Sequence, residues 1–86
     1  MNQREIAQLI PATYRREILE LNIVVQSRPI ASDPNMNYLG IMWKEYISPG
    51  EDLTCGLCLQ RILDNFRSLQ AVFIELEKES KLLASV

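Results

Sequence analysis

The side chains best suited to chemistry in this sequence are its two cysteines, Cys55 and Cys58, which form a CxxC motif. The motif lies near the expected start of a long helix, where unpaired backbone N–H groups stabilise a thiolate and lower its pKa. A thiol–disulfide exchange site would use Cys55 as the nucleophile and Cys58 as the resolving thiol. The βαβ surroundings typical of such a site are absent from the sequence.

A metal ion and a purely structural role are the two other interpretations of the motif. Structural zinc takes four ligands, and this chain has no histidine, so Cys55 and Cys58 would form an all-thiolate site only if two copies shared one ion. Glu51 and Asp52 could complete a site within one chain, but such mixed ligand sets are uncommon. The sequence favours the structural role, with Cys55 buried and no cofactor, because small thiols are among the most buried side chains.

Catalytic equipment is sparse in this chain. Without histidine it lacks the usual general base and the usual activator of a serine or cysteine nucleophile. Three carboxylates, Glu75, Glu77 and Glu79, alternate with Lys78 and Lys81, a pattern typical of a solvated helix face. No glycine-rich phosphate loop is present. We therefore expect a protein that is not an enzyme.

Length and composition indicate one folded domain over residues 1–86. Hydrophobic residues make up 48% of the 86 residues and charged residues 23%, which is ordinary for a globular protein. The net charge of -2 disfavours attraction to nucleic acid or anionic lipid. No apolar run approaches the roughly 18 residues of a membrane span, and no signal peptide is recognisable. We expect a cytoplasmic protein without a membrane partner.

Proline and glycine divide the chain into four predicted helices. Apolar spacing predicts helices over residues 2–10 and 11–26, separated at Pro11. A third helix over 34–47 follows Asp33 and Pro34, a favoured pairing of N-cap acceptor and first-turn proline, and Ser48-Pro49-Gly50 ends it. The fourth helix covers 53–84.

The fourth helix carries a heptad seam of about four repeats. Its positions are Cys55, Leu59, Ile62, Phe66, Leu69, Phe73, Leu76, Ser80 and Leu83. Such a helix is nearly 50 Å long at about 1.5 Å per residue, which is more than three short helices can cover. The sequence therefore predicts an all-α fold: a small helical bundle of three or four helices with one long C-terminal, heptad-patterned helix. A second copy of the chain, giving a dimer, or a different protein would cover the remainder.

Further apolar side chains are candidates for contact with a protein partner. Tyr38, Trp43 and Tyr46 share a face of the third helix, where aromatic residues form either a core or an interface hot spot. On the long helix, Leu63, Val72 and Ile74 lie outside the seam. We take these six as the candidate partner-binding residues. The arginines are dispersed among acidic residues, which makes nucleic acid the weaker candidate partner.

One arrangement of short motifs comprises Trp43-Lys44-Glu45-Tyr46, then Pro49, then Cys55-Gly56-Leu57-Cys58 and a leucine-rich helix. This arrangement resembles that of small proteins encoded by bacteriophages and mobile elements of Bacteroidetes. The resemblance implies a phage accessory protein acting in the host cytoplasm, for instance an inhibitor of a host defence nuclease, but supplies no site residues. We expect a non-catalytic protein-binding module. The alternative is an accessory protein that binds nucleic acid or assists packaging or assembly.

Overall fold

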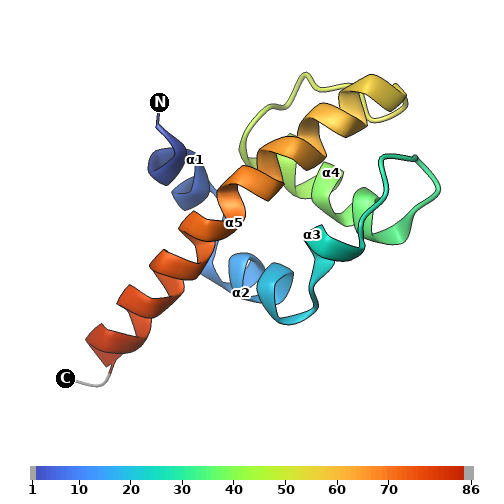
Figure 1. Ribbon diagram of the computed structural model, residues 1–86. Helices are drawn as coiled ribbons and strands as arrows, with labels where there is room; N and C mark the ends of the chain where they lie inside the picture. The colour runs from blue at the N-terminus through green and yellow to red at the C-terminus, as the bar shows by residue number, and fades with distance from the viewer. Residues whose placement is uncertain (1, 85–86) are drawn as a thin grey trace.

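The computed structural model describes residues 2–84, which form five α-helices and no strand (Figure 1). This confirms the predicted all-α fold with one long C-terminal helix. In chain order the helices are α1 (Gln3–Leu9), α2 (Ala12–Glu20), α3 (Ile23–Gln26), α4 (Pro34–Tyr46) and α5 (Gly56–Ala84).

The long helix α5 organises the whole molecule. It contacts each of the four shorter helices, which lie along its length in Figure 1. Its 29 residues correspond to about 43 Å at 1.5 Å per residue, and the longest dimension of the molecule is 45 Å. The length of α5 therefore sets the length of the protein.

The heptad seam of α5 forms the centre of the hydrophobic core. Its buried positions are Leu59, Ile62, Phe66, Leu69, Phe73 and Leu76. The shorter helices and the residues next to them contribute Ala7, Ile10, Ile18, Ile23, Val24, Met36, Leu39 and Met42. The seam is thus covered within one chain as far as Leu76. Beyond the last covering helix its final apolar position, Leu83, is 78% exposed.

The helix predicted over residues 11–26 is divided into α2 and α3, which raises the number of helices above the expected three or four. The division occurs at Asn22, whose φ of 52° and ψ of 40° place it in the left-handed region. Asparagine enters this region more readily than most residues with a Cβ atom. The turn directs Ile23 and Val24 into the core, where both are buried.

The N-terminus of α4 has the predicted cap. Asp33 Oδ2 accepts a hydrogen bond from the backbone N–H of Met36 at 2.9 Å, and Pro34 is the first helical residue. The same oxygen accepts from the backbone N–H of Arg28 at 3.1 Å, which closes the loop that precedes the helix. One carboxylate therefore fixes both the loop and the start of α4.

Candidate functional site

The two cysteines lie at the first turn of α5. This helix begins at Gly56, so Cys55 occupies the N-cap position rather than an interior turn. The Cys55 carbonyl accepts from the N–H of Leu59 at 3.0 Å, and Cys55 Sγ accepts from the N–H of Cys58 at 3.4 Å. The sulfur thus takes the place of the oxygen with which serine or aspartate caps a helix.

The position of Cys55 differs from the expectation that it is buried on the seam. Both cysteines are partly exposed and free, and neither belongs to the hydrophobic core. The helix starts later than predicted because Asp52 holds the preceding residues in a turn: its Oδ1 accepts from the N–H and the hydroxyl of Thr54. The expected burial of Cys55 is therefore wrong, and the structural role that remains for it is to cap α5.

Leu53, the middle residue of the turn from Asp52 to Thr54, packs the segment before Cys55 against α4. Its side chain packs against Gly40, where an added Cβ would lie 3.1 Å from Leu53 Cδ2. Only a glycine lets the leucine approach the helix backbone this closely without displacement. The dithiol is therefore held by a packed contact on one side and by the first turn of α5 on the other.

The two thiols have different acidities. The Cys58 thiol and backbone N–H donate to Cys55 Sγ, and these hydrogen bonds lower the pKa of Cys55 from its ordinary value. The same thiol contact, together with desolvation, raises the pKa of Cys58, although the Arg61 guanidinium partly offsets the rise. The first cysteine is therefore the more readily ionised one, as in a dithiol with a nucleophilic and a resolving member.

Metal ligands are few around the dithiol. Within residues 2–84, no group of three or more histidine, cysteine, aspartate or glutamate side chains surrounds a common point. Cys55 and Cys58 supply two of the four ligands that structural zinc takes. A second copy of the chain would have to supply the other two.

The predicted aromatic face of α4 packs mostly inward. Tyr38, Trp43 and Tyr46 are partly buried against the core. Trp43 meets Phe66 edge-on with ring centroids 5.8 Å apart, and Tyr46 lies 6.0 Å from Tyr14. These rings therefore resemble a core edge more than an open interface.

The candidate contacts on α5 lie at three different depths. Leu63 is fully buried in the core, so it is not accessible to a partner in this conformation. Val72 is partly buried against the core, and Ile74 is 41% exposed. Of the six candidate partner-binding residues, Ile74 is therefore the most open to contact.

Two polar atoms of α4 are buried without a hydrogen bond of good geometry in the described part of the chain: Tyr38 Oη and Trp43 Nε1. Burial raises the pKa of Tyr38 to about 12, and the nearby Glu17 carboxylate contributes by disfavouring a second negative charge. Tyr38 therefore stays protonated in the folded protein at a pH where an ordinary tyrosine ionises.

Tyr38→Phe should leave the free energy of unfolding at neutral pH unchanged or slightly higher, because it removes a buried hydroxyl that makes no hydrogen bond of good geometry. Because the folded pKa of Tyr38 is raised, the unfolded chain ionises first, and the wild type loses free energy of unfolding as the pH rises from about 10 toward about 12. The variant should lack this loss, which should reach about 1 kcal/mol after screening by solvent. Urea denaturation of both proteins at several pH values between about 9 and 12 measures this difference. If the free energy of unfolding fell equally with pH in the two proteins, the prediction would be contradicted.

A groove of about 290 Å³ lies between α2 and the C-terminal half of α5. Leu19 and Ile74 provide its apolar surface, and a mixed set of charged side chains surrounds them: Arg16, Glu20, Glu77, Lys78 and Lys81. Arg16 Nε donates to Glu77 Oε1 at 2.9 Å, which ties the two helices together beside the groove. The groove joins residues far apart in the sequence, so no local motif indicated it.

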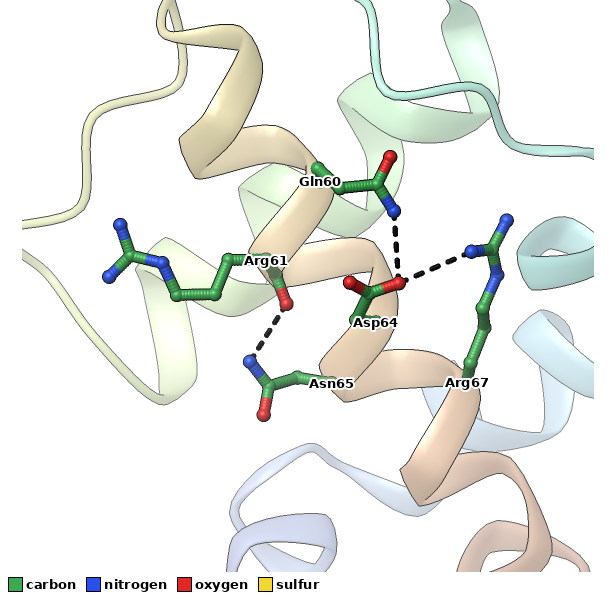
Figure 2. Close-up of polar contacts among 5 residues, drawn as sticks. All are labelled: Gln60, Arg61, Asp64, Asn65 and Arg67. Carbon is green, nitrogen blue, oxygen red and sulfur yellow. Dashed lines mark hydrogen bonds and ion pairs between the residues drawn. The ribbon is translucent and has the colours of Figure 1, made fainter.

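Several of the arginines are engaged within the chain. Arg4 pairs with Glu79 at 2.7 Å, and the Arg15 guanidinium donates to the carbonyl of Ile10. Figure 2 shows Arg67 and Gln60 both donating to Asp64 Oδ1 on α5, a mixed polar surface rather than a basic one. This arrangement gives little support to a phosphate-binding face.

The described helices include none that is both long and apolar enough to cross a bilayer. Comparison with protein-family models, curated proteins and solved structures gave no match to this chain.

Proposed function

We propose that this chain is a non-catalytic protein-binding module that docks an acidic, amphipathic helix of its partner in the groove between α2 and α5. The observation that carries the proposal is Ile74, an isoleucine 41% exposed beside Leu19 in a groove bordered by Lys78 and Lys81. Apolar surface enclosed by charged side chains is the usual arrangement of a protein-binding site.

The charges of the groove support an acidic partner. Arg16 and Glu77 neutralise each other through their ion pair. Lys78 and Lys81 make no ion pair within residues 2–84, so the remaining charge beside Ile74 is mainly positive. Among the residues that line the groove, Glu20 is the one acid outside that ion pair. The chain as a whole carries a net charge of -2, so the positive charge at the groove differs from the charge of the rest of the molecule.

The last turns of α5 carry further exposed apolar side chains outside the groove. Leu82 and Leu83 are 67% and 78% exposed, and α5 projects beyond α1 and α2 in Figure 1. Leu83 lies roughly half a turn around α5 from Ile74, so a partner that fills the groove does not have to contact it. The groove itself lies between two helices and has an apolar floor with charged borders, which favours an amphipathic helix as the partner.

The phage-like motif arrangement favours a host protein as the partner, with a defence nuclease as one case. A module of this kind inhibits by covering a functional surface, which needs no catalytic group of its own. A second copy of the chain is the competing occupant. Native mass spectrometry of the purified protein distinguishes the two, because a dimer that Ile74→Glu dissociates would assign the groove to a second copy.

The proposal is tested first by site-specific crosslinking in host cells. A photoreactive amino acid at position 74 should capture a partner, whereas the same group at Leu57, which is 82% exposed at the other end of α5, should not. Equal capture at both positions would contradict a site in the groove.

The captured protein, once purified, should lose affinity for Ile74→Glu by roughly tenfold or more, because the change places a charge in the apolar contact. Reversal of Lys78 and Lys81 to glutamate should weaken binding similarly and reduce its dependence on salt. Reversal of Lys44, exposed on α4, is the matched control and should change little. Retardation of DNA or RNA that weakens steeply with salt would instead favour the nucleic-acid alternative.

A further inference from the structure

The dithiol is a second feature of the molecule, separate from the groove. It lies at the N-terminal end of α5, whereas the groove lies toward the C-terminal end. Cys55 and Cys58 are both partly exposed, and Cys55 Sγ is within hydrogen-bonding reach of the Cys58 thiol and N–H. A buried structural pair would lack this exposure to solvent and to small disulfides.

We propose that Cys55 and Cys58 form a thiol–disulfide exchange site that small disulfides, such as glutathione disulfide, convert reversibly into an intrachain disulfide. Three observations carry the proposal: the contact between the two sulfurs, their exposure, and the backbone N–H that donates to Cys55 Sγ. The site takes a low-molecular-weight disulfide as its oxidant, and the corresponding thiol reverses the reaction.

The chemistry proceeds in two exchange steps. The Cys55 thiolate attacks one sulfur of glutathione disulfide, forms a mixed disulfide and releases one glutathione thiolate. The Cys58 sulfur, after loss of its proton, then attacks Cys55 Sγ and releases the second glutathione. The two cysteine thiols lose two electrons and two protons, and glutathione disulfide gains both to become two molecules of glutathione.

The roles of the two cysteines follow from their surroundings. Hydrogen bonds from the Cys58 thiol and N–H, and from the N–H of Leu57, lower the pKa of Cys55, so a larger fraction of it is thiolate near neutral pH. The raised pKa of Cys58 keeps that thiol protonated until the mixed disulfide has formed. Cys55 is therefore the attacking residue and Cys58 the resolving one.

The experiment uses the full chain, reduced and freed of metal by a chelator, in buffers with graded ratios of oxidised to reduced glutathione. After acid quenching and unfolding, a maleimide labels the remaining thiols and intact mass reports the products. The wild-type protein should pass from two labels to none without a stable glutathione adduct. Reversal by reduced glutathione should restore both labels.

Two serine variants separate the roles of the cysteines. Cys58→Ser should stop at a glutathione adduct on Cys55, because no second thiol displaces it. Cys55→Ser should form its adduct roughly tenfold more slowly, since the remaining thiol has the higher pKa. Serine is a favoured N-cap, so this variant should fold, and circular dichroism checks that it does. In denaturant the two variants should react at equal rates.

Three results would overturn the proposal. One is a wild-type protein that keeps both labels in the most oxidising buffer. The second is oxidation that yields disulfide-linked dimers in place of the intrachain bond. The third is equal reactivity of the two serine variants in the folded state, which would remove the distinct roles assigned to Cys55 and Cys58.

Discussion

Phe66→Ala is expected to lower the free energy of unfolding by about 3 to 5 kcal/mol, the range typical of truncating a buried phenylalanine. Phe66 is fully buried on the seam of α5, and its ring meets Trp43 and Phe73 edge-on at centroid distances of 5.8 and 6.3 Å. Truncation removes both ring contacts and leaves a cavity in the middle of the core. Urea denaturation of both proteins measures the loss, which should appear as a lower midpoint at an unchanged m value.

The size of this loss matters because small domains hold only about 5 to 15 kcal/mol in reserve. The matched control is Leu57→Ala on the same helix, where the leucine is 82% exposed and its removal should change the free energy of unfolding by less than about 0.5 kcal/mol. Equal effects of the two changes would show that the seam does not form the core described here. If Phe66→Ala does not fold, Phe66→Leu gives a smaller loss in the same direction.

The sequence predicted the long helix well because its signal is redundant. A heptad repeat sets many apolar positions on one face, so the departure of any one residue does not alter the assignment. The pattern could not identify what covers the seam. We expected a second copy of the chain or a different protein to cover what the shorter helices do not reach. The shorter helices bury the seam as far as Leu76, and Leu83 beyond them is exposed. The seam is buried by contacts with helices that are distant in sequence, and the apolar period of one helix does not reveal such contacts.

Two local details escaped prediction for related reasons. The division at Asn22 depends on one residue entering the left-handed region, and an exposed asparagine within an apolar pattern gives only a weak signal of it. The start of α5 depends on the Asp52 turn, which places Cys55 at the N-cap. Because the heptad pattern can be extended back to Cys55, the sequence suggested burial where the structure has a helix terminus.

The candidate site was predictable only in part. CxxC spacing near a helix start indicated the dithiol, since both cysteines belong to one short segment. The groove required Leu19 of α2 to meet Ile74 of α5, and this pairing depends on how the helices cross. Sequence reasoning selected Ile74 for its apolar character but could not separate it from Leu63, which is fully buried. Burial, unlike hydropathy, is a property of the assembled fold.

One helix, α5, carries both proposed sites. The dithiol lies at the N-terminus of α5 and the groove lies near its C-terminus. Ion pairs from Arg4 to Glu79 and from Arg16 to Glu77 hold α1 and α2 against the C-terminal half. We expect oxidation to alter the first turn of α5 and its contact with α4, at the end of the helix away from the groove. We therefore expect binding in the groove to be unaffected by the redox state of the dithiol.

Asp33→Ala is expected to lower the free energy of unfolding by about 1 to 2 kcal/mol, at the upper side of the usual range for a lost N-cap. The Asp33 carboxylate accepts from the backbone N–H groups of Met36 and Arg28 at 2.9 and 3.1 Å, so its removal leaves two donors without a partner. Met36 is fully buried, and the start of α4 therefore cannot fray without exposing core surface.

Asp33→Asn is the matched control for this cap. The amide oxygen can accept the same two hydrogen bonds, so this variant should lose only the attraction between the carboxylate and the helix dipole, about 0.3 to 1 kcal/mol. The loss on going to alanine should persist at high salt, because it comes from hydrogen bonds, whereas the smaller loss in Asp33→Asn should shrink. Urea denaturation at two salt concentrations measures both. An alanine variant as stable as the wild type would mean that water satisfies Met36 and Arg28 equally well, and that the core, rather than the cap, determines where α4 begins.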